Sequence, residues 1–107
     1  MKKLLVLLAL VPTLCFAKND FYTGNSLLDK LTDDSPQWRM LGLGYVVGVY
    51  AAQSETLCVP MSVSAGQLKD VAEAFLKNTP ELRHLAAADL VWMALMKAWP
   101  CANTKRL

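Results

Sequence analysis

The chain has 107 residues, of which 54% are hydrophobic and 19% charged, and its formal net charge is +2. That length predicts one domain. Of the eleven lysine and arginine residues, Lys2 and Lys3 stand at the very start, and without them nine basic residues face nine acidic ones. No basic stripe remains elsewhere, so composition argues against a protein that binds nucleic acid or an anionic membrane surface.

The first 17 residues are typical of a cleavable secretory signal. Lys2 and Lys3 precede an apolar run from Leu4 to Val11, and Cys15-Phe16-Ala17 places small residues where a signal peptidase recognises them. The run is far shorter than the roughly 20 residues of a membrane-spanning helix. A lipoprotein signal acylated at Cys15 is the weaker alternative, because Leu14 is bulky for that position. We expect a periplasmic protein with a single domain over residues 18–107, free of the membrane after cleavage.

Two cysteines remain after the signal, Cys58 and Cys101, and they have one possible pairing in an oxidising compartment. They bracket the clearest helical patterns, and Pro60 and Pro100 end regular structure beside them. In the chain-entropy model, closing a loop of about 43 residues removes roughly 4 kcal/mol of denatured-state freedom. We therefore predict a Cys58–Cys101 disulfide that stabilises a small domain.

Two helices are expected in the first half of the domain. Leucines on one edge predict a short helix over residues 26–32, capped by Gly24 or Asn25. Ser35 and Pro36 suit the cap and first position of a second helix over residues 36–53. One apolar stripe runs along this second helix: Trp38, Leu41, Tyr45, Val49 and Ala52.

The second helix contains Gly42, Gly44 and Gly48, each of which costs about 1 kcal/mol relative to alanine. Gly44 and Gly48 lie four residues apart on one face, so we expect another helix to approach closely there. A strand over residues 44–51 is the open alternative, because Tyr45-Val46-Val47 is rich in strand formers.

Two more helices are expected in the second half. Ser64 and Gln67 match a capping box, and the apolar spacing that follows predicts a helix to residue 78. Thr79 and Pro80 suit the start of a fourth helix over residues 80–98, whose apolar character nearly all round predicts a central position and places its Trp and Met side chains in the core. The predicted fold class is all-α, a compact four-helix domain with one disulfide.

Catalytic and metal chemistry find little support. The single histidine, His84, is expected in the first turns of the fourth helix, and with two paired thiols it supplies no credible zinc ligand set. Ser62, Ser64 and Asp89 could form a Ser-His-Asp set with His84, but no nucleophile motif in the sequence supports that arrangement. We expect no enzyme, no cofactor and no metal.

Short motifs in the same order along the chain resemble the Rap/Tai immunity proteins. These motifs are Gly24-Asn25-Ser26-Leu27-Leu28, Gly44-Tyr45-Val46-Val47-Gly48-Val49, Cys58-Val59-Pro60, Pro80 with Arg83-His84, and Pro100-Cys101. Members of this family are small secreted helical proteins that protect bacteria against peptidoglycan amidase effectors of type VI secretion. The resemblance implies an immunity protein that binds and blocks an amidase effector, and it allows a homodimer.

The resemblance also implies a second cysteine pair, at places occupied here by Leu31 and Gly42. Two cysteines that form one disulfide are expected to be lost together, and both are absent here. A diverged member with another partner is therefore an alternative, and the fold transfers more readily than the partner.

We predict that the partner surface includes the polar turn Gln53, Ser54 and Glu55, which Cys58 holds. The loop carboxylates Asp33 and Asp34 are a second place where charge can meet a partner. Two other classes stay open: a small periplasmic stress or chaperone-like binding protein, and a secreted enzyme that depends on His84.

Overall fold

The computed structural model describes residues 22–101, so the expected signal (1–17) and the residues after Cys101 lie outside the described part. The described chain forms α1 (Gly24–Leu31), α2 (Pro36–Ala52), α3 (Ala65–Asn78), a 3-10 turn η3 (Pro80–Leu82) and α4 (Ala87–Ala98). Cys58 and Cys101 are joined by a disulfide. The predicted all-α four-helix fold with one disulfide is confirmed for residues 22–101.

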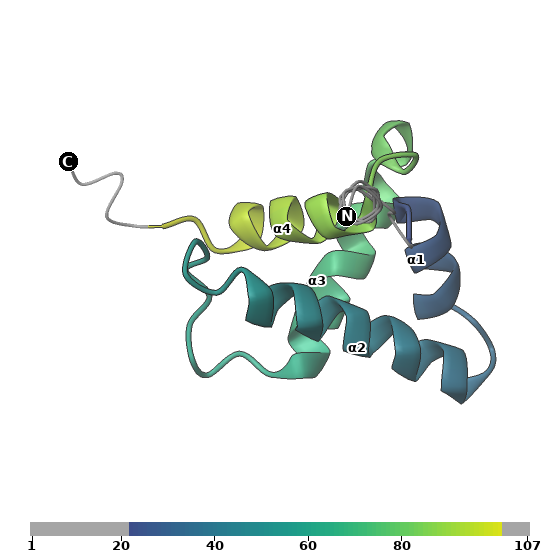
Figure 1. Cartoon of the computed structure of the whole chain (residues 1–107), viewed down its shortest axis with the longest axis horizontal. Coiled ribbons are helices and arrows are strands. Elements are labelled where there is room, and N and C mark those ends of the chain that lie inside the picture. Colours follow the sequence, from purple (N-terminus) through teal and green to yellow (C-terminus); the bar gives the residue numbers. More distant parts are fainter. Residues whose placement is uncertain (1–21, 102–107) are drawn as a thin grey trace, which may run out of the picture.

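All four helices pack around one apolar core. In Figure 1, α2 and α4 extend across the molecule, α3 crosses behind them, and α1 stands at one end. The last helix contacts each of the other three, as its apolar sequence predicted. The largest fully buried side chains are Leu27, Leu31, Val46, Leu76, Leu90, Val91 and Leu95. Full burial of each such side chain contributes about 1.5–3 kcal/mol of hydrophobic stabilisation.

The first helix begins two residues earlier than expected, and its cap is Thr23 in place of Gly24 or Asn25. Thr23 Oγ1 accepts from the Ser26 amide at 3.2 Å, and the Thr23 amide donates to Ser26 Oγ at 2.9 Å. A hydroxyl at each position lets the two residues satisfy each other's amides, which is the logic of a capping box. Serine thus replaces the usual Glu or Gln at the third helical position.

The fourth helix is shorter than the predicted 80–98, because its expected first turns bond to α1. The Gly24 amide donates to Leu85 O at 3.0 Å and the Asn25 amide donates to Arg83 O at 2.9 Å, while the Ala87 amide donates to Tyr22 O at 2.9 Å. A continuous helix would need Arg83 O for the Ala87 amide. The chain therefore makes η3 and a turn before α4 begins.

Thr79 stands at the cap position and Pro80 at the first position, as predicted, but they begin the 3-10 turn η3 and not the fourth α-helix. The Thr79 hydroxyl caps no backbone amide and donates backwards to Phe75 O at 2.7 Å. The prediction for His84 is wrong. His84 lies in the exposed turn between η3 and α4, outside any helix.

The second helix occupies Pro36–Ala52, so the strand alternative over residues 44–51 is wrong. Ser35 stands at the cap position, but its hydroxyl donates to Gln37 Oε1 at 2.8 Å and does not cap a backbone amide. Asp33 Oδ1 instead accepts from the Ser35 amide at 2.8 Å, which orders the turn before the helix. Among the described helices, none combines the length and the apolar character needed to cross a bilayer.

The core side of α2 coincides only in part with the predicted apolar stripe. Tyr45 and Val49 of that stripe pack partly buried against the core, whereas Trp38, Leu41 and Ala52 are exposed. The fully buried positions of the helix are Gly42 and Val46. Neighbouring residues of an α-helix point about 100° apart, so an offset of one residue turns the inward face, and here the contact with α1 decides which face that is.

The glycine prediction is wrong for the same reason. A Cβ added at Gly44 or Gly48 would meet no atom within 4 Å, so no other helix of the described residues 22–101 approaches there. The close approach is at Gly42, where a Cβ would lie 2.8 Å from Leu31 Cδ2.

Candidate partner-binding site

The predicted partner-binding residues form an exposed turn directly after α2. The Gln53 amide donates to Val49 O at 2.9 Å and ends the helix, and the Thr56 amide donates to Gln53 O at 3.0 Å. Gln53, Ser54 and Glu55 are all exposed within this turn, while Leu57 just beyond it is buried in the core. The structure therefore brings the three predicted residues together on the surface, and their role in binding stays a prediction.

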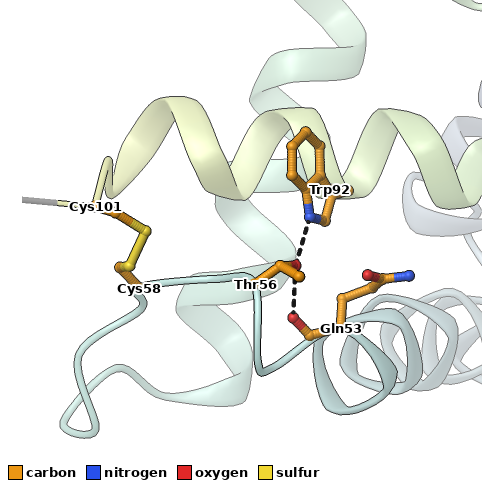
Figure 2. Close-up of a disulfide and its surroundings, with 5 residues drawn as sticks. All are labelled: Gln53, Thr56, Cys58, Trp92 and Cys101. Carbon is orange, nitrogen blue, oxygen red and sulfur yellow. Dashed lines mark hydrogen bonds between the residues drawn. A yellow bond between two sulfur atoms is a disulfide. The ribbon is translucent and has the colours of Figure 1, made fainter. Parts of the chain in front are cut away.

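A hydrogen bond between side chains ties this turn to α4. Trp92 Nε1 donates to Thr56 Oγ1 at 3.0 Å, and Thr56 Oγ1 donates to Gln53 O at 3.0 Å, as Figure 2 shows. The Thr56 hydroxyl thus joins the indole of α4 to the carbonyl of Gln53, the residue that caps the C-terminus of α2. Trp92 packs partly against the core, as predicted, but its indole nitrogen faces the turn. Sequence reasoning missed this pair, because nothing local links positions 56 and 92.

The disulfide holds the next part of the same segment. Cys58 and Cys101 have Cα atoms 5.1 Å apart, which attaches the chain after the turn to the end of α4 (Figure 2). The turn is therefore held at buried Leu57, at Trp92 and at Cys58. A segment held at several points loses little conformational freedom when it binds.

An open hollow lies beside the turn. Its volume is about 410 Å³, and it is lined by Gln53, Ala88, Asp89, Trp92 and Met93. Gln53 and Asp89 supply hydrogen-bonding groups, and Trp92 and Met93 supply apolar surface. This mixture suits a side chain of a partner protein that has an apolar body and a polar tip.

The segment then continues to a second exposed tip at Met61. This side chain is 97% exposed, and the Val63 amide donates to Pro60 O at 3.1 Å to close the turn around it. Val59 and Val63 pack against the core on either side, so the methionine stands on a fixed base. Sequence reasoning missed Met61, because a single methionine in a loop carries no signal that distinguishes it from a core residue.

The capping box of α3 fixes the exit from this segment. The Gln67 amide donates to Ser64 Oγ at 3.1 Å, and the Ser64 amide donates to Gln67 Oε1 at 2.9 Å, as predicted. We call residues 53–63 the clamped loop, since helix ends, a disulfide and an indole bond hold both of its tips.

Other residues considered from the sequence are not brought together. Within residues 22–101 no hydrogen bond joins His84 to Ser62, Ser64 or Asp89, and Ser64 is engaged in its cap. The described part holds no group of three His, Cys, Asp or Glu side chains placed to bind a metal ion.

Comparison with known proteins identifies the family. A family model for Rap1a immunity proteins matches residues 23–101, from the cap of α1 to the second cysteine of the disulfide. No curated protein and no solved structure matches the chain. Since the matched segment contains all four helices, the clamped loop and both cysteines, this chain belongs to the Rap1a immunity protein family.

Proposed function

We propose that this protein is a periplasmic immunity protein that binds and blocks a peptidoglycan amidase effector of type VI secretion, and that the clamped loop makes the contact. Membership of the Rap1a immunity family supports the immunity role. The observation that carries the choice of surface is the fully exposed Met61 next to the exposed Gln53–Glu55 turn, on one segment tied to the core.

Blocking requires no catalytic group in the immunity protein. A rigid protrusion that enters the effector's cleft excludes substrate, and a few buried anchors supply most of the affinity. Met61 is the natural apolar anchor, because an exposed thioether is flexible enough to fit an irregular pocket. The hollow beside Trp92 would receive a side chain from the effector in return.

Charge restricts the kind of cleft that fits. Glu55 is the only charged residue of the clamped loop. The surface therefore suits a mainly apolar cleft with hydrogen-bond donors or one basic group at its rim, placed to meet the Glu55 carboxylate.

The test begins with the partner. The chain is exported in its native form, purified from the periplasm and used to capture proteins from envelope and secreted fractions. One stoichiometric partner with amidase activity that the chain suppresses would support the proposal. Many substoichiometric clients would instead favour the stress or chaperone-like alternative.

Variants then test the surface. Replacing Met61→Glu is expected to weaken amidase binding by roughly 30-fold or more, as for an interface anchor worth about 2 kcal/mol. The triple change Gln53→Ala, Ser54→Ala and Glu55→Ala should weaken binding further. The control is Glu81→Ala, an exposed change in η3 at the opposite end of the molecule (Figure 1). Unchanged inhibition in both loop variants would move the contact to another surface.

A further inference from the structure

The hollow beside the clamped loop lies between the end of α2 and the first turns of α4. Gln53, which caps α2, lines one side of it. The other lining residues share one face of α4, because they recur at spacings of three and four residues. These residues are Ala88, Asp89, Trp92 and Met93. Two elements that are distant in the sequence therefore build this hollow together.

The Trp92 ring forms a fixed wall of the hollow. Its Nε1 donates to Thr56 Oγ1 at 3.0 Å, and this bond holds the indole in one orientation. Ala88 lies one turn earlier on the same face and is too small to cover the ring, so Trp92 stays only half-buried. Since the indole nitrogen is engaged by the turn, the rest of the ring offers carbon atoms and π electrons to an occupant.

Asp89 is the one charged residue among the described residues that line the hollow. Its side chain is exposed, and within residues 22–101 its carboxylate makes no hydrogen bond or ion pair. Glu55 of the clamped loop, two residues after Gln53, is also acidic and exposed. A group that enters the hollow therefore meets negative charge, and a cation is its complementary occupant.

The walls suit arginine better than lysine. A guanidinium group is planar and weakly hydrated, so it can stack on an indole while its N–H groups donate to a carboxylate. The Gln53 side chain, which extends below the Trp92 ring in Figure 2, adds an amide oxygen as a second acceptor. The Met93 thioether offers apolar surface to the methylene groups of the arginine. A lysine ammonium is compact and strongly hydrated, and it gains less from a flat ring.

We infer that this hollow binds an arginine side chain of the effector, an inference that rests on the proposed function. A free guanidinium compound has only these open walls and should bind weakly. Within an interface that the clamped loop already anchors, the same contact should raise affinity about 10-fold, which corresponds to about 1.4 kcal/mol. Asp89 and Trp92 are then the residues that recognise the arginine.

N-Butylguanidinium tests the hollow without any effector. It is titrated into the exported, nitrogen-15-labelled chain, and the indole signals of the three tryptophans are followed by nuclear magnetic resonance. The Trp92 signal, identified by its loss in Trp92→Phe, should shift with a dissociation constant on the order of 10 mM. The signals of Trp38 and Trp99 should stay in place, because neither residue lines the hollow.

Two comparisons show whether charge and shape are both recognised. N-Butylurea, which is neutral and has the same shape, and n-butylammonium, which has the charge without the plane, should each bind about 5-fold more weakly or worse. Asp89→Asn should weaken butylguanidinium binding about 5-fold, and the control Glu81→Gln, an exposed carboxylate in η3, should leave it unchanged. A Trp92 signal that does not move, equal binding of the urea, or unchanged binding in Asp89→Asn would overturn the inference.

The amidase then tests the occupant. Asp89→Asn should weaken amidase binding about 10-fold, and Asp89→Glu should recover part of the loss because it keeps the charge. One arginine of the amidase should cost about the same when it is changed to alanine, and in that background Asp89→Asn should have no further effect.

The outcomes separate this inference from the proposed function. An amidase that binds the wild type and is indifferent to Asp89→Asn would overturn the assignment of the arginine, while the proposed function stands. Failure to capture any amidase would overturn the proposed function and the effector as the source of the arginine, while the butylguanidinium titration still reports whether the hollow recognises the group.

Discussion

Leu31 packs directly onto Gly42, joining the end of α1 to the first half of α2. A Cβ at Gly42 would lie 2.8 Å from Leu31 Cδ2, 3.2 Å from Leu31 Cγ and 3.3 Å from the Leu31 amide nitrogen. These two positions are the ones at which the family resemblance implies a second cysteine pair. Here an apolar contact between a buried leucine and a glycine occupies the place of that bridge.

The first prediction concerns the space at Gly42. Gly42→Ala should lower the free energy of unfolding by about 1–2 kcal/mol, because overpacking against buried Leu31 outweighs the gain of about 1 kcal/mol in helix propensity. Urea denaturation measures the change. Gly66→Ala is the control, since its nearest neighbour, Ser64 Oγ, lies at 3.8 Å, and it should be neutral or stabilising. Equal stability of the two variants would contradict the packing argument.

The second prediction restores a covalent link at the same place. The double change Leu31→Cys and Gly42→Cys should form a disulfide on export, which mass measurement and thiol counting detect. Closing this short loop stabilises by roughly 3 kcal/mol in the chain-entropy model, against about 2–5 kcal/mol lost with the buried leucine. The oxidised double variant should therefore unfold at a clearly higher urea concentration than Leu31→Ala. Persistent free thiols would show that the two Cβ positions are not aligned for a bridge.

The third prediction tests the bond that ties the clamped loop to α4. Trp92→Phe keeps the apolar ring and removes the donor to Thr56 Oγ1, so it should cost about 1 kcal/mol. Amide hydrogen exchange at Thr56 and Leu57 should become faster, because the turn loses an attachment. Trp99→Phe serves as control, since no side-chain hydrogen bond is described for that indole within residues 22–101. Exchange that is unchanged in Trp92→Phe would mean that Leu57 and the disulfide hold the turn by themselves.

The fourth prediction is a pH dependence at Glu73 on α3. Its carboxylate lies 2.9 Å from both Lys69 Nζ and Lys77 Nζ, and its side chain is 17% exposed. Partial burial raises the pKa of Glu73, but the hydrogen bonds and charges of the two lysines outweigh it, so the pKa lies below its ordinary value.

The sign of the effect follows from that direction. A carboxyl group whose pKa is lower in the folded state stabilises above the unfolded pKa of about 4.3, and this contribution disappears as pH falls through the folded pKa. Glu73→Gln should lose about 0.5–1 kcal/mol at pH 7, the range for two partly exposed ion pairs at helical spacing, and match the wild type near pH 2. A difference that is constant across the titration would assign the effect to packing.

Local chemistry in the sequence was sufficient for several elements. Ser64 and Gln67 reach each other because they lie three residues apart, so their capping box and the start of α3 could be predicted without the rest of the chain. The same holds for Pro36 at the start of α2, whose ring fits only the first turn. After the expected signal is removed, one pairing of the remaining cysteines is available, which made the disulfide predictable as well.

Side-chain roles on the surface were less predictable. Gln53, Ser54 and Glu55 were predicted as an exposed polar turn and lie in one. Met61 and the bond from Trp92 to Thr56 were missed, because exposure of a methionine and a contact across 36 residues depend on how α4 lies against the loop.

The sequence by itself therefore determined where local hydrogen bonds begin α2 and α3, which cysteines pair, and that the chain is helical and apolar enough to form one core. Tertiary structure decided where α4 begins and which face of α2 turns inward. The physical reason is competition for the same groups. The carbonyls of Arg83 and Leu85 accept amides of α1 in place of their own helix, and Leu31 fills the space that only a glycine at position 42 leaves open.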